Sequence, residues 1–127
     1  MADLADVRRL ALALPGAVER QARDGRVSWT VRGTGFVWER PLLRGDLEAL
    51  GAAAPTGTVL GARVADLGVK SALLASDPDV VFTTPHFDGY AAVLVRLDDI
   101  GPAELEELVV DAWRTRASKR QREQLDG

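Results

Sequence analysis

The sequence contains no cysteine and only one histidine, His86. Without cysteine the chain has no disulfide, no thiolate nucleophile and no zinc site with cysteine ligands. No uncharged apolar run approaches the ~18 residues of a membrane-spanning helix, and the first residues lack the basic-then-apolar pattern of a signal peptide. We therefore expect a cytoplasmic protein with no membrane partner, no metal and no cofactor.

Lysine and asparagine are also scarce: lysine occurs twice among the 16 basic residues, and asparagine does not occur. Arginine has GC-rich codons and lysine and asparagine AT-rich ones, so abundant arginine does not by itself indicate a ligand and is consistent with a bacterial source. The 127 residues, 46% hydrophobic and 28% charged, are typical of a globular domain. With no internal repeat or long linker, we expect one domain over residues 1–117 and a basic, flexible tail over residues 118–127.

Two segments have the apolar spacing of amphipathic helices. The first is predicted over residues 3–14 and begins at Asp3, whose carboxylate can cap it. The last is predicted to begin at Pro102, a residue favoured in the first helical turn. Its apolar stripe comprises Leu105, Leu108, Val109, Ala112 and Trp113. Short helices are predicted after Asp46 and over residues 67–75.

Between these helices the apolar pattern changes to a period of two, which is typical of strands. A hairpin is predicted around a Gly33-Thr34 turn, pairing Trp29 with Trp38 and Val31 with Phe36. This register places all four large side chains on one face. The other predicted strands are Thr58–Val64, Val80–Thr83 and Tyr90–Leu97.

Short connections between these strands favour an antiparallel sheet, and the amphipathic helices must bury their apolar stripes against it. The predicted fold class is therefore α+β: a two-layer sandwich with the N- and C-terminal helices on one face of an antiparallel sheet. In the strand Tyr90–Leu97, Tyr90 and Leu94 point to the opposite face. Either further helices cover that face or it binds a partner.

Several segments carry a family resemblance. They are ALALPG at 11–16, GRVSWTV at 25–31, ALLASDP at 72–78, VFTTPHFDGY at 81–90 and VLVRL at 93–97, followed by the helix over 104–113. Together they resemble the MmcQ/YjbR family of small bacterial proteins. The resemblance implies a frataxin-like (CyaY-like) sandwich, often described as a double-wing DNA-binding motif. Frataxins bind iron with a strongly acidic first helix, whereas here two acids in that helix are balanced by Arg8 and Arg9, so we expect no iron site.

The charge distribution is bipolar although the net charge is −3. Residues 18–44 carry six arginines and three acids, residues 114–122 carry five cations and no acid, and residues 45–113 carry three cations and twelve acids. We expect weak, sequence-tolerant binding to double-stranded DNA by a non-catalytic protein, because arginines on a hairpin mainly contact phosphates. The candidate residues are Arg26, Arg32, Arg40, Arg44, Arg114, Arg116, Lys119 and Arg120. The alternative is a solvated basic surface with no ligand.

A second hypothesis is an adaptor that binds a protein or small ligand through the exposed sheet face and the loop containing His86, Asp88 and Tyr90. His86 titrates near neutral pH and lies close to Asp88 in sequence. An enzyme using these two residues would need a concave pocket at that loop. No serine lies in a Gly-x-Ser-x-Gly motif, so the sequence does not indicate a hydrolase.

Overall fold

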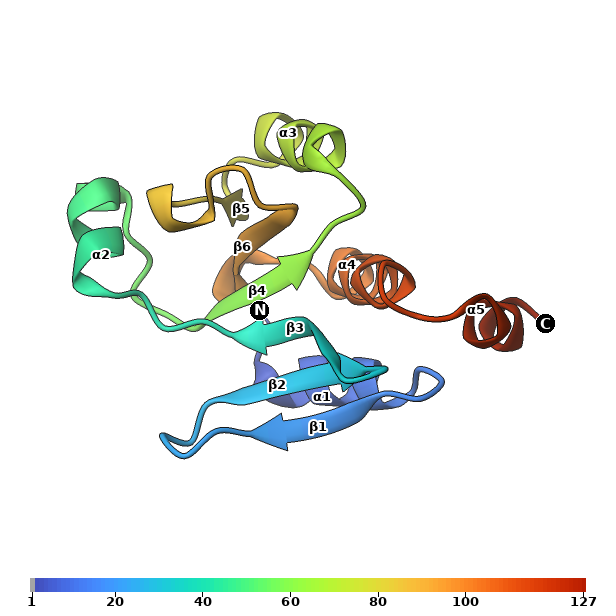
Figure 1. Ribbon diagram of the computed structural model, residues 1–127. Coiled ribbons are helices and arrows are strands. Elements are labelled where there is room, and N and C mark those ends of the chain that lie inside the picture. Colours follow the sequence, from blue (N-terminus) through green and yellow to red (C-terminus); the bar gives the residue numbers. More distant parts are fainter. Residues whose placement is uncertain (1) are drawn as a thin grey trace.

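A six-stranded antiparallel sheet, in the order β1-β2-β3-β4-β6-β5, forms the centre of the computed structural model, which describes residues 2–127 (Figure 1). The strands are β1 Val18–Gln21, β2 Val27–Val31, β3 Thr34–Glu39, β4 Val59–Arg63, β5 Val81–Phe82 and β6 Ala92–Arg96. The α-helices are α1 Leu4–Leu12, α2 Arg44–Leu50, α3 Leu67–Ser76, α4 Pro102–Arg114 and α5 Lys119–Asp126. Three short 3₁₀ turns are η1 Gly51–Ala53, η2 Pro85–Phe87 and η3 Leu97–Asp99.

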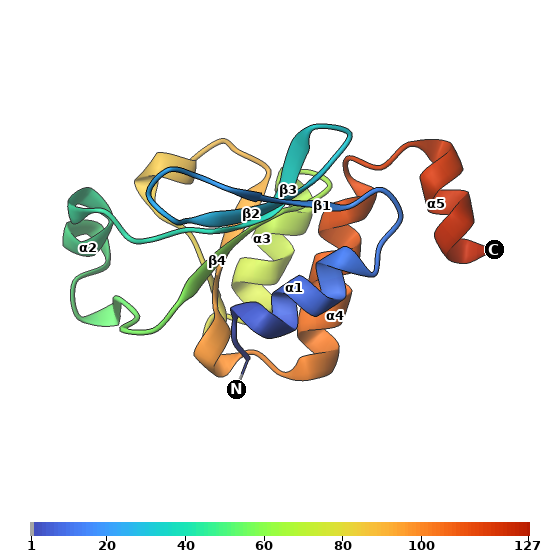
Figure 2. The same cartoon turned by 90° about the horizontal axis from the view of Figure 1, so that it is seen from below.

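Helices α1 and α4 lie together on one face of the sheet, as predicted (Figure 2). Their buried residues meet the inward-facing side chains of β2, β3, β4 and β6. This main core includes Val7, Ala11, Trp29, Val31, Leu60, Ala62, Val93, Val95, Val109 and Trp113. The Trp113 Nε1–H donates to the Pro15 carbonyl at 2.9 Å, which fixes the end of α4 to the chain after α1. The α+β sandwich with the two terminal-region helices on one face is confirmed.

The starts of α1, α3 and α4 follow the capping chemistry in the sequence, whereas α2 begins at Arg44 and not after Asp46 as predicted. Asp3 accepts from the Asp6 amide at 3.0 Å and Asp6 accepts from the Asp3 amide at 3.1 Å, which forms a capping box at α1. Asp66 accepts from the Val69 amide at 2.8 Å at the start of α3. Pro102 begins α4 as expected. Helix α1 ends at Leu12, two residues before the predicted end.

The predicted register of the β2–β3 hairpin is wrong. The turn lies at Arg32-Gly33, and Trp29 pairs with Val37 rather than with Trp38. The register shifts beside Trp29 because Phe36 is an extra residue in β3. Phe36 and Val37 are both buried in the main core, as in a β-bulge, so the alternation shifts by one residue and Trp38 points to the opposite face.

Trp38 belongs to a second, smaller apolar cluster on that opposite face, with Val59, Phe82, Phe87 and Leu94. The side chains of Leu42 and Leu50, before and within α2, pack against it. The sequence analysis left open whether helices or a partner cover Tyr90 and Leu94. The chain itself covers Leu94, which is 0% exposed, whereas Tyr90 precedes β6 and is 64% exposed.

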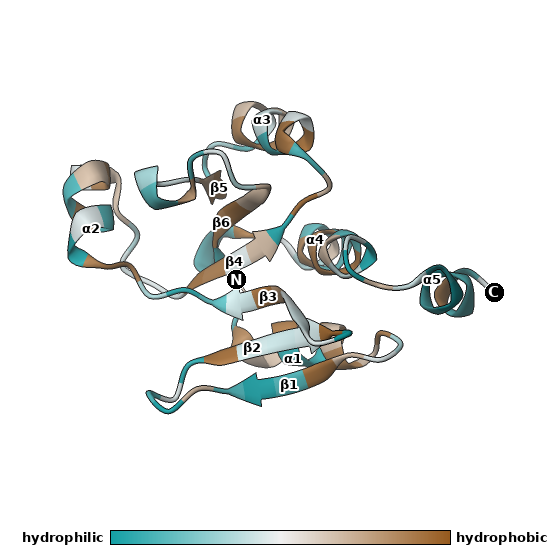
Figure 3. Ribbon diagram, in the orientation of Figure 1, coloured by the Kyte–Doolittle hydropathy of each residue, from teal (hydrophilic) through white to brown (hydrophobic). Residues whose placement is uncertain are grey.

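Strand β1 and helix α5 were not predicted. All four residues of β1 are exposed, and both elements are strongly hydrophilic (Figure 3). Polar contacts hold β1: Glu19 accepts from Trp29 Nε1–H at 3.1 Å and pairs with Arg8 at 3.0 Å. At α5, Ser118 and Gln121 form a capping box. Neither element has an apolar periodicity, so hydropathy could not reveal them.

Gly61 is a test of this arrangement, because a Cβ there would lie 2.3 Å from Cε2 of the Trp38 ring. We expect Gly61→Ala to lower the free energy of unfolding by about 1–3 kcal/mol through overpacking, measured by urea denaturation. Gly45→Ala is the control, since a Cβ at Gly45 would meet nothing within 4 Å. Equal stability of Gly61→Ala and the parent protein would contradict the placement of Trp38 over Gly61.

Candidate functional site

Arg32 stands at the tip of the β2–β3 hairpin. Its φ is 54° and that of Gly33 is 78°, so both central residues of the turn have the positive φ required by the tight hairpin turn of type I′. Glycine adopts such a backbone freely, whereas a residue with a side chain does so uncommonly. The structure thus keeps the exposed Arg32 at the outermost point of the hairpin.

The hairpin tip lies beside the connection from α4 to α5 (Figures 1 and 2). Arg63, at the end of β4, donates from Nε to the Gly35 carbonyl at 2.8 Å and so reaches the base of the turn. Burial and the neighbouring charge of Arg116 lower the pKa of Arg63 from its usual value. Arg63 was not among the sequence candidates, because only the tertiary fold brings it to the hairpin.

Helix α5 is attached to the rest of the domain by several contacts. The Arg114 guanidinium donates to both carboxylate oxygens of Asp126, at 2.6 and 3.2 Å. Gln121 lies against Gly16, where a Cβ would be 2.3 Å from the Gln121 Nε2. The Arg122 Nη1 donates to the Ala117 carbonyl at 2.7 Å. These contacts hold the first turn of α5, with Lys119 and Arg120, next to the α4–α5 connection.

We call the resulting surface the basic end. It consists of Arg32, Arg63, Arg116, Lys119 and Arg120. Among the ion pairs formed by residues 2–127, none includes any of these five side chains. Four of the eight sequence candidates therefore lie on elements that meet here, and none of their side chains forms an ion pair with a carboxylate among residues 2–127.

Three other candidates do not join the basic end as free cations. Arg26 lies at the β1–β2 turn, at the other end of β2 from Arg32, and pairs with Asp24 at 2.6 Å. Arg44 begins α2 and pairs with Glu48 at 3.2 Å. Arg114 is next to the basic end in sequence, but its guanidinium is bound to Asp126.

The eighth candidate, Arg40, is not on the surface, and the expectation that it contacts DNA is corrected. The residue is only 7% exposed. Its Nη2 donates to Asp46 at 3.1 Å, it also donates to the Pro41 carbonyl, and its guanidinium lies 5.2 Å from the centre of the Phe87 ring. Burial raises the pKa of Asp46, but the Leu43 amide and the Arg40 charge outweigh it and hold that pKa below its usual value. Arg40 therefore forms a buried ion pair with Asp46 that is part of the protein's structure.

Removing one partner of this buried pair would leave the other charge uncompensated. We expect Asp46→Ala to lower the free energy of unfolding by about 3–5 kcal/mol, measured by urea denaturation. The exposed Arg44–Glu48 pair provides the control, and Glu48→Ala should change stability by less than about 0.5 kcal/mol. A similar small effect of both substitutions would show that Arg40 is stable without its partner.

The loop with His86, Asp88 and Tyr90 is held from beneath by Lys70. Lys70 is buried, and its Nζ donates to the carbonyls of Phe87 at 2.7 Å and Tyr90 at 3.0 Å. Burial lowers the pKa of Lys70 from its usual value. The three candidate side chains are exposed, and none of them lines the groove between α3 and α4 that is described next. That groove therefore does not supply the pocket at this loop that an enzyme using His86 and Asp88 would need.

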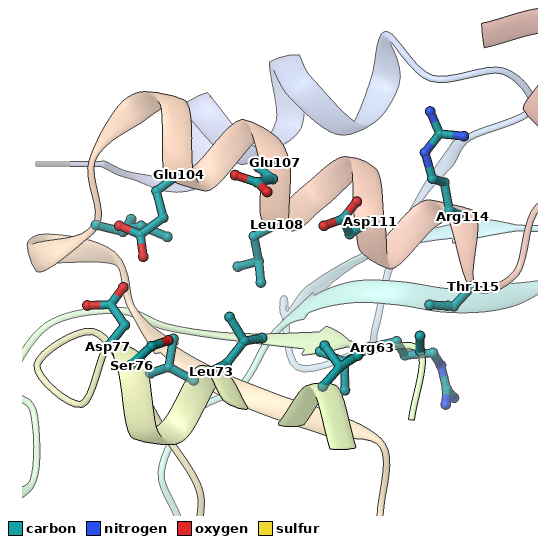
Figure 4. Close-up of a pocket in the computed structure, with 15 residues that line it drawn as sticks. Arg63, Leu73, Ser76, Asp77, Glu104, Glu107, Leu108, Asp111, Arg114 and Thr115 are labelled. Atoms are coloured by element: carbon teal, nitrogen blue, oxygen red, sulfur yellow. The ribbon is translucent and has the colours of Figure 1, made fainter. Parts of the chain in front are cut away.

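A groove with a volume of about 570 Å³ lies between α3 and α4 (Figure 4). Leu73 from α3 and Leu108 from α4 point toward each other across it. The apolar lining comprises Val64, Ala65, Val69, Leu73, Val81, Ile100 and Leu108. Four carboxylates, those of Asp77, Glu104, Glu107 and Asp111, lie along it, and Arg63 and Arg114 lie at its other end.

Asp77 and Glu104 face each other at the acidic end of the groove (Figure 4). Their hydrogen bond, together with partial burial and the negative charges of Asp77 and Glu107, raises the pKa of Glu104 to about 7. Part of the Glu104 carboxyl groups are therefore protonated near neutral pH. Acids at 104, 107 and 111 recur with helical spacing, but the sequence could not show that Asp77 faces them.

The raised pKa of Glu104 makes stability depend on pH. Between the ordinary value of 4.5 and the folded-state value of about 7, the folded protein binds more protons at Glu104 than the unfolded chain does. The free energy of unfolding must therefore decrease as pH rises through this window. Solvent screening at this exposed site limits the change to about 1 kcal/mol.

We expect Glu104→Gln to remove most of this decrease, as measured by urea denaturation at pH values on both sides of the window. Glu106→Gln is the matched control, because Glu106 is exposed on the same helix but does not line the groove. If the Glu104→Gln protein loses as much stability with rising pH as the parent, the raised pKa of Glu104 is disproved.

Comparisons with known proteins agree with this architecture. The crystal structure of protein DR2400 from Deinococcus radiodurans, which has a DUF419 domain, superposes on this structure with a TM-score of 0.69. The superposition covers 99% of this chain and 89% of DR2400, and the two sequences are 17% identical. At this identity the match supports the fold alone. None of the helices formed by residues 2–127 is long and apolar enough to cross a membrane.

The family model YjbR matches residues 12–115, so the chain belongs to the YjbR family. It is also 48% identical over 122 residues to the uncharacterized proteins Rv2570 of Mycobacterium tuberculosis and Mb2600 of Mycobacterium bovis. Each match covers 94% of this chain and 92% of the relative. The resemblance found in the sequence is thereby confirmed at the level of the family.

Proposed function

We propose that this YjbR-family protein binds double-stranded DNA weakly and without catalysis, through the basic end. The observation that supports this function is the gathering of five cations, from the hairpin tip, β4, the α4–α5 connection and α5, with no carboxylate paired to any of them among the described residues. Affinity for duplex DNA depends mainly on neutralising phosphates, and an unpaired arginine or lysine can do so without first losing a salt bridge.

The chemistry of the basic end favours contacts to the DNA backbone over contacts to bases. None of its five residues is aromatic. The Trp38 ring lies 5.9 Å from the Arg63 guanidinium but is half-buried against the second apolar cluster, and Phe36 is buried in the main core. Its side chains come from a short turn and from the ends of helices and strands, so no helix face is presented to the major groove. Binding is therefore expected to tolerate any sequence and to decrease steeply with salt.

The size of the salt effect follows from the number of cations. If all five contact phosphates, the logarithm of the binding constant should fall against the logarithm of salt concentration with a slope of about −4 to −5. The net charge of −3 acts against binding at long range, which keeps the affinity low. Arg26, Arg44 and Arg40 contribute nothing in this account, because each is paired with a carboxylate.

The test is a fluorescence anisotropy titration of a labelled duplex at low salt. We expect Arg32→Glu combined with Arg116→Glu to weaken binding at least about tenfold and to reduce the salt slope by about 2. Arg26→Glu combined with Arg44→Glu makes the same change of charge at the opposite end of β2 and on α2, and it should weaken binding much less. The proposal fails if the two double variants bind equally well, or if the parent protein does not bind at tens of micromolar.

A further inference from the structure

We propose that the groove between α3 and α4 binds a small organic cation with an apolar body, its ammonium group held by Asp77 and Glu104. This site shares only Arg63 with the basic end, and Arg63 lies at the end of the groove away from Asp77 and Glu104. Its acidic end lies at the start of α4, whereas the basic end lies beyond the last turn of that helix.

The apolar lining argues for an apolar body. Leu73 is only half-buried and Val69 is 40% exposed, although both are aliphatic residues on a helix packed against the domain. A ligand lying between them and Leu108 would remove this surface from water, which is the main source of affinity in small-molecule sites. The volume of about 570 Å³ is within the range of pockets that hold such molecules.

The charges in the groove argue for a cation. The four carboxylates have no arginine or lysine bound to them in the described part of the chain. The two arginines lie at the far end, where Arg114 turns away from the groove toward Asp126 and the Arg63 Nε donates to the Gly35 carbonyl (Figure 4). At the acidic end an anion would therefore meet carboxyl groups with no cation bound to them, whereas an ammonium group would be attracted.

The spread of the carboxylates argues against a metal ion. No three acidic or histidine side chains within residues 2–127 converge closely enough to hold one. Asp77 and Glu104 form a pair at one end, while Glu107 and Asp111 follow along α4 beside the apolar floor. Such a pair can hold one ammonium group through its N–H donors, and the aliphatic surface beyond it can receive the rest of the molecule.

The experiment compares three probes with one alkyl chain and different head groups: octylammonium, octanol and octanoate. Binding is followed by ¹H–¹⁵N NMR of the full chain at neutral pH. We expect saturable shifts of amides in α3 and in α4 with octylammonium, and at least about fivefold weaker binding of octanol and octanoate. Spermidine, which has charge but no continuous apolar body, should also bind more weakly than octylammonium.

Variants separate the head-group contact from the apolar contact. Asp77→Asn combined with Glu104→Gln should weaken octylammonium about five- to tenfold and leave octanol unchanged. Glu106→Gln, on the outer side of α4, should change neither, and unaltered amide spectra in the absence of probe will show that the variants are folded. Equal binding of octylammonium and octanol, shifts located outside the groove, or binding of a basic peptide but not of octylammonium would overturn the proposal.

Discussion

The register of the β2–β3 hairpin is the constraint on which the rest of the structure depends. A turn at Arg32-Gly33 and an extra residue at Phe36 place Phe36 and Val37 in the main core and Trp38 on the opposite face. Each face of the sheet thereby receives an aromatic side chain to bury. Gly61 has no side chain and so leaves room for the Trp38 ring. Because of the bulge, the short strand β3 contributes side chains to both apolar clusters.

The same register determines the distribution of charge. It places Arg32 at the hairpin tip, close to the hydrogen bond that the Arg63 Nε donates to the Gly35 carbonyl. Helix α5, which carries Lys119 and Arg120, lies beside the tip. The acids of residues 45–113 lie partly along the groove between α3 and α4. A chain with a net charge of −3 therefore has a cationic surface and an acidic groove as separate features. Composition alone would indicate neither.

Much of the fold could be predicted from sequence because its main signals are local. The Asp3 cap and the apolar stripe of the last helix depend only on neighbouring residues, and both are found in the structure. The bulge at Phe36 could not be predicted, because a strict alternation gives no sign of an extra residue. Arg40 was misplaced because no sequence pattern marks the turn that brings Asp46 back to it, and the ring of Phe87 reaches it only through the tertiary fold. Arg63 and the Asp77–Glu104 pair were missed for the same reason.

The central claim is that the five cations of the basic end, none of which forms an ion pair among the described residues, are the ones that meet DNA. The most direct measurement is a ¹H–¹⁵N NMR titration of the protein with a short duplex at low salt. The account predicts that the perturbed amides lie in the hairpin turn, at the end of β4 and from residue 115 to residue 122. Perturbation centred on the β1–β2 turn and α2, or on no contiguous surface, would contradict it.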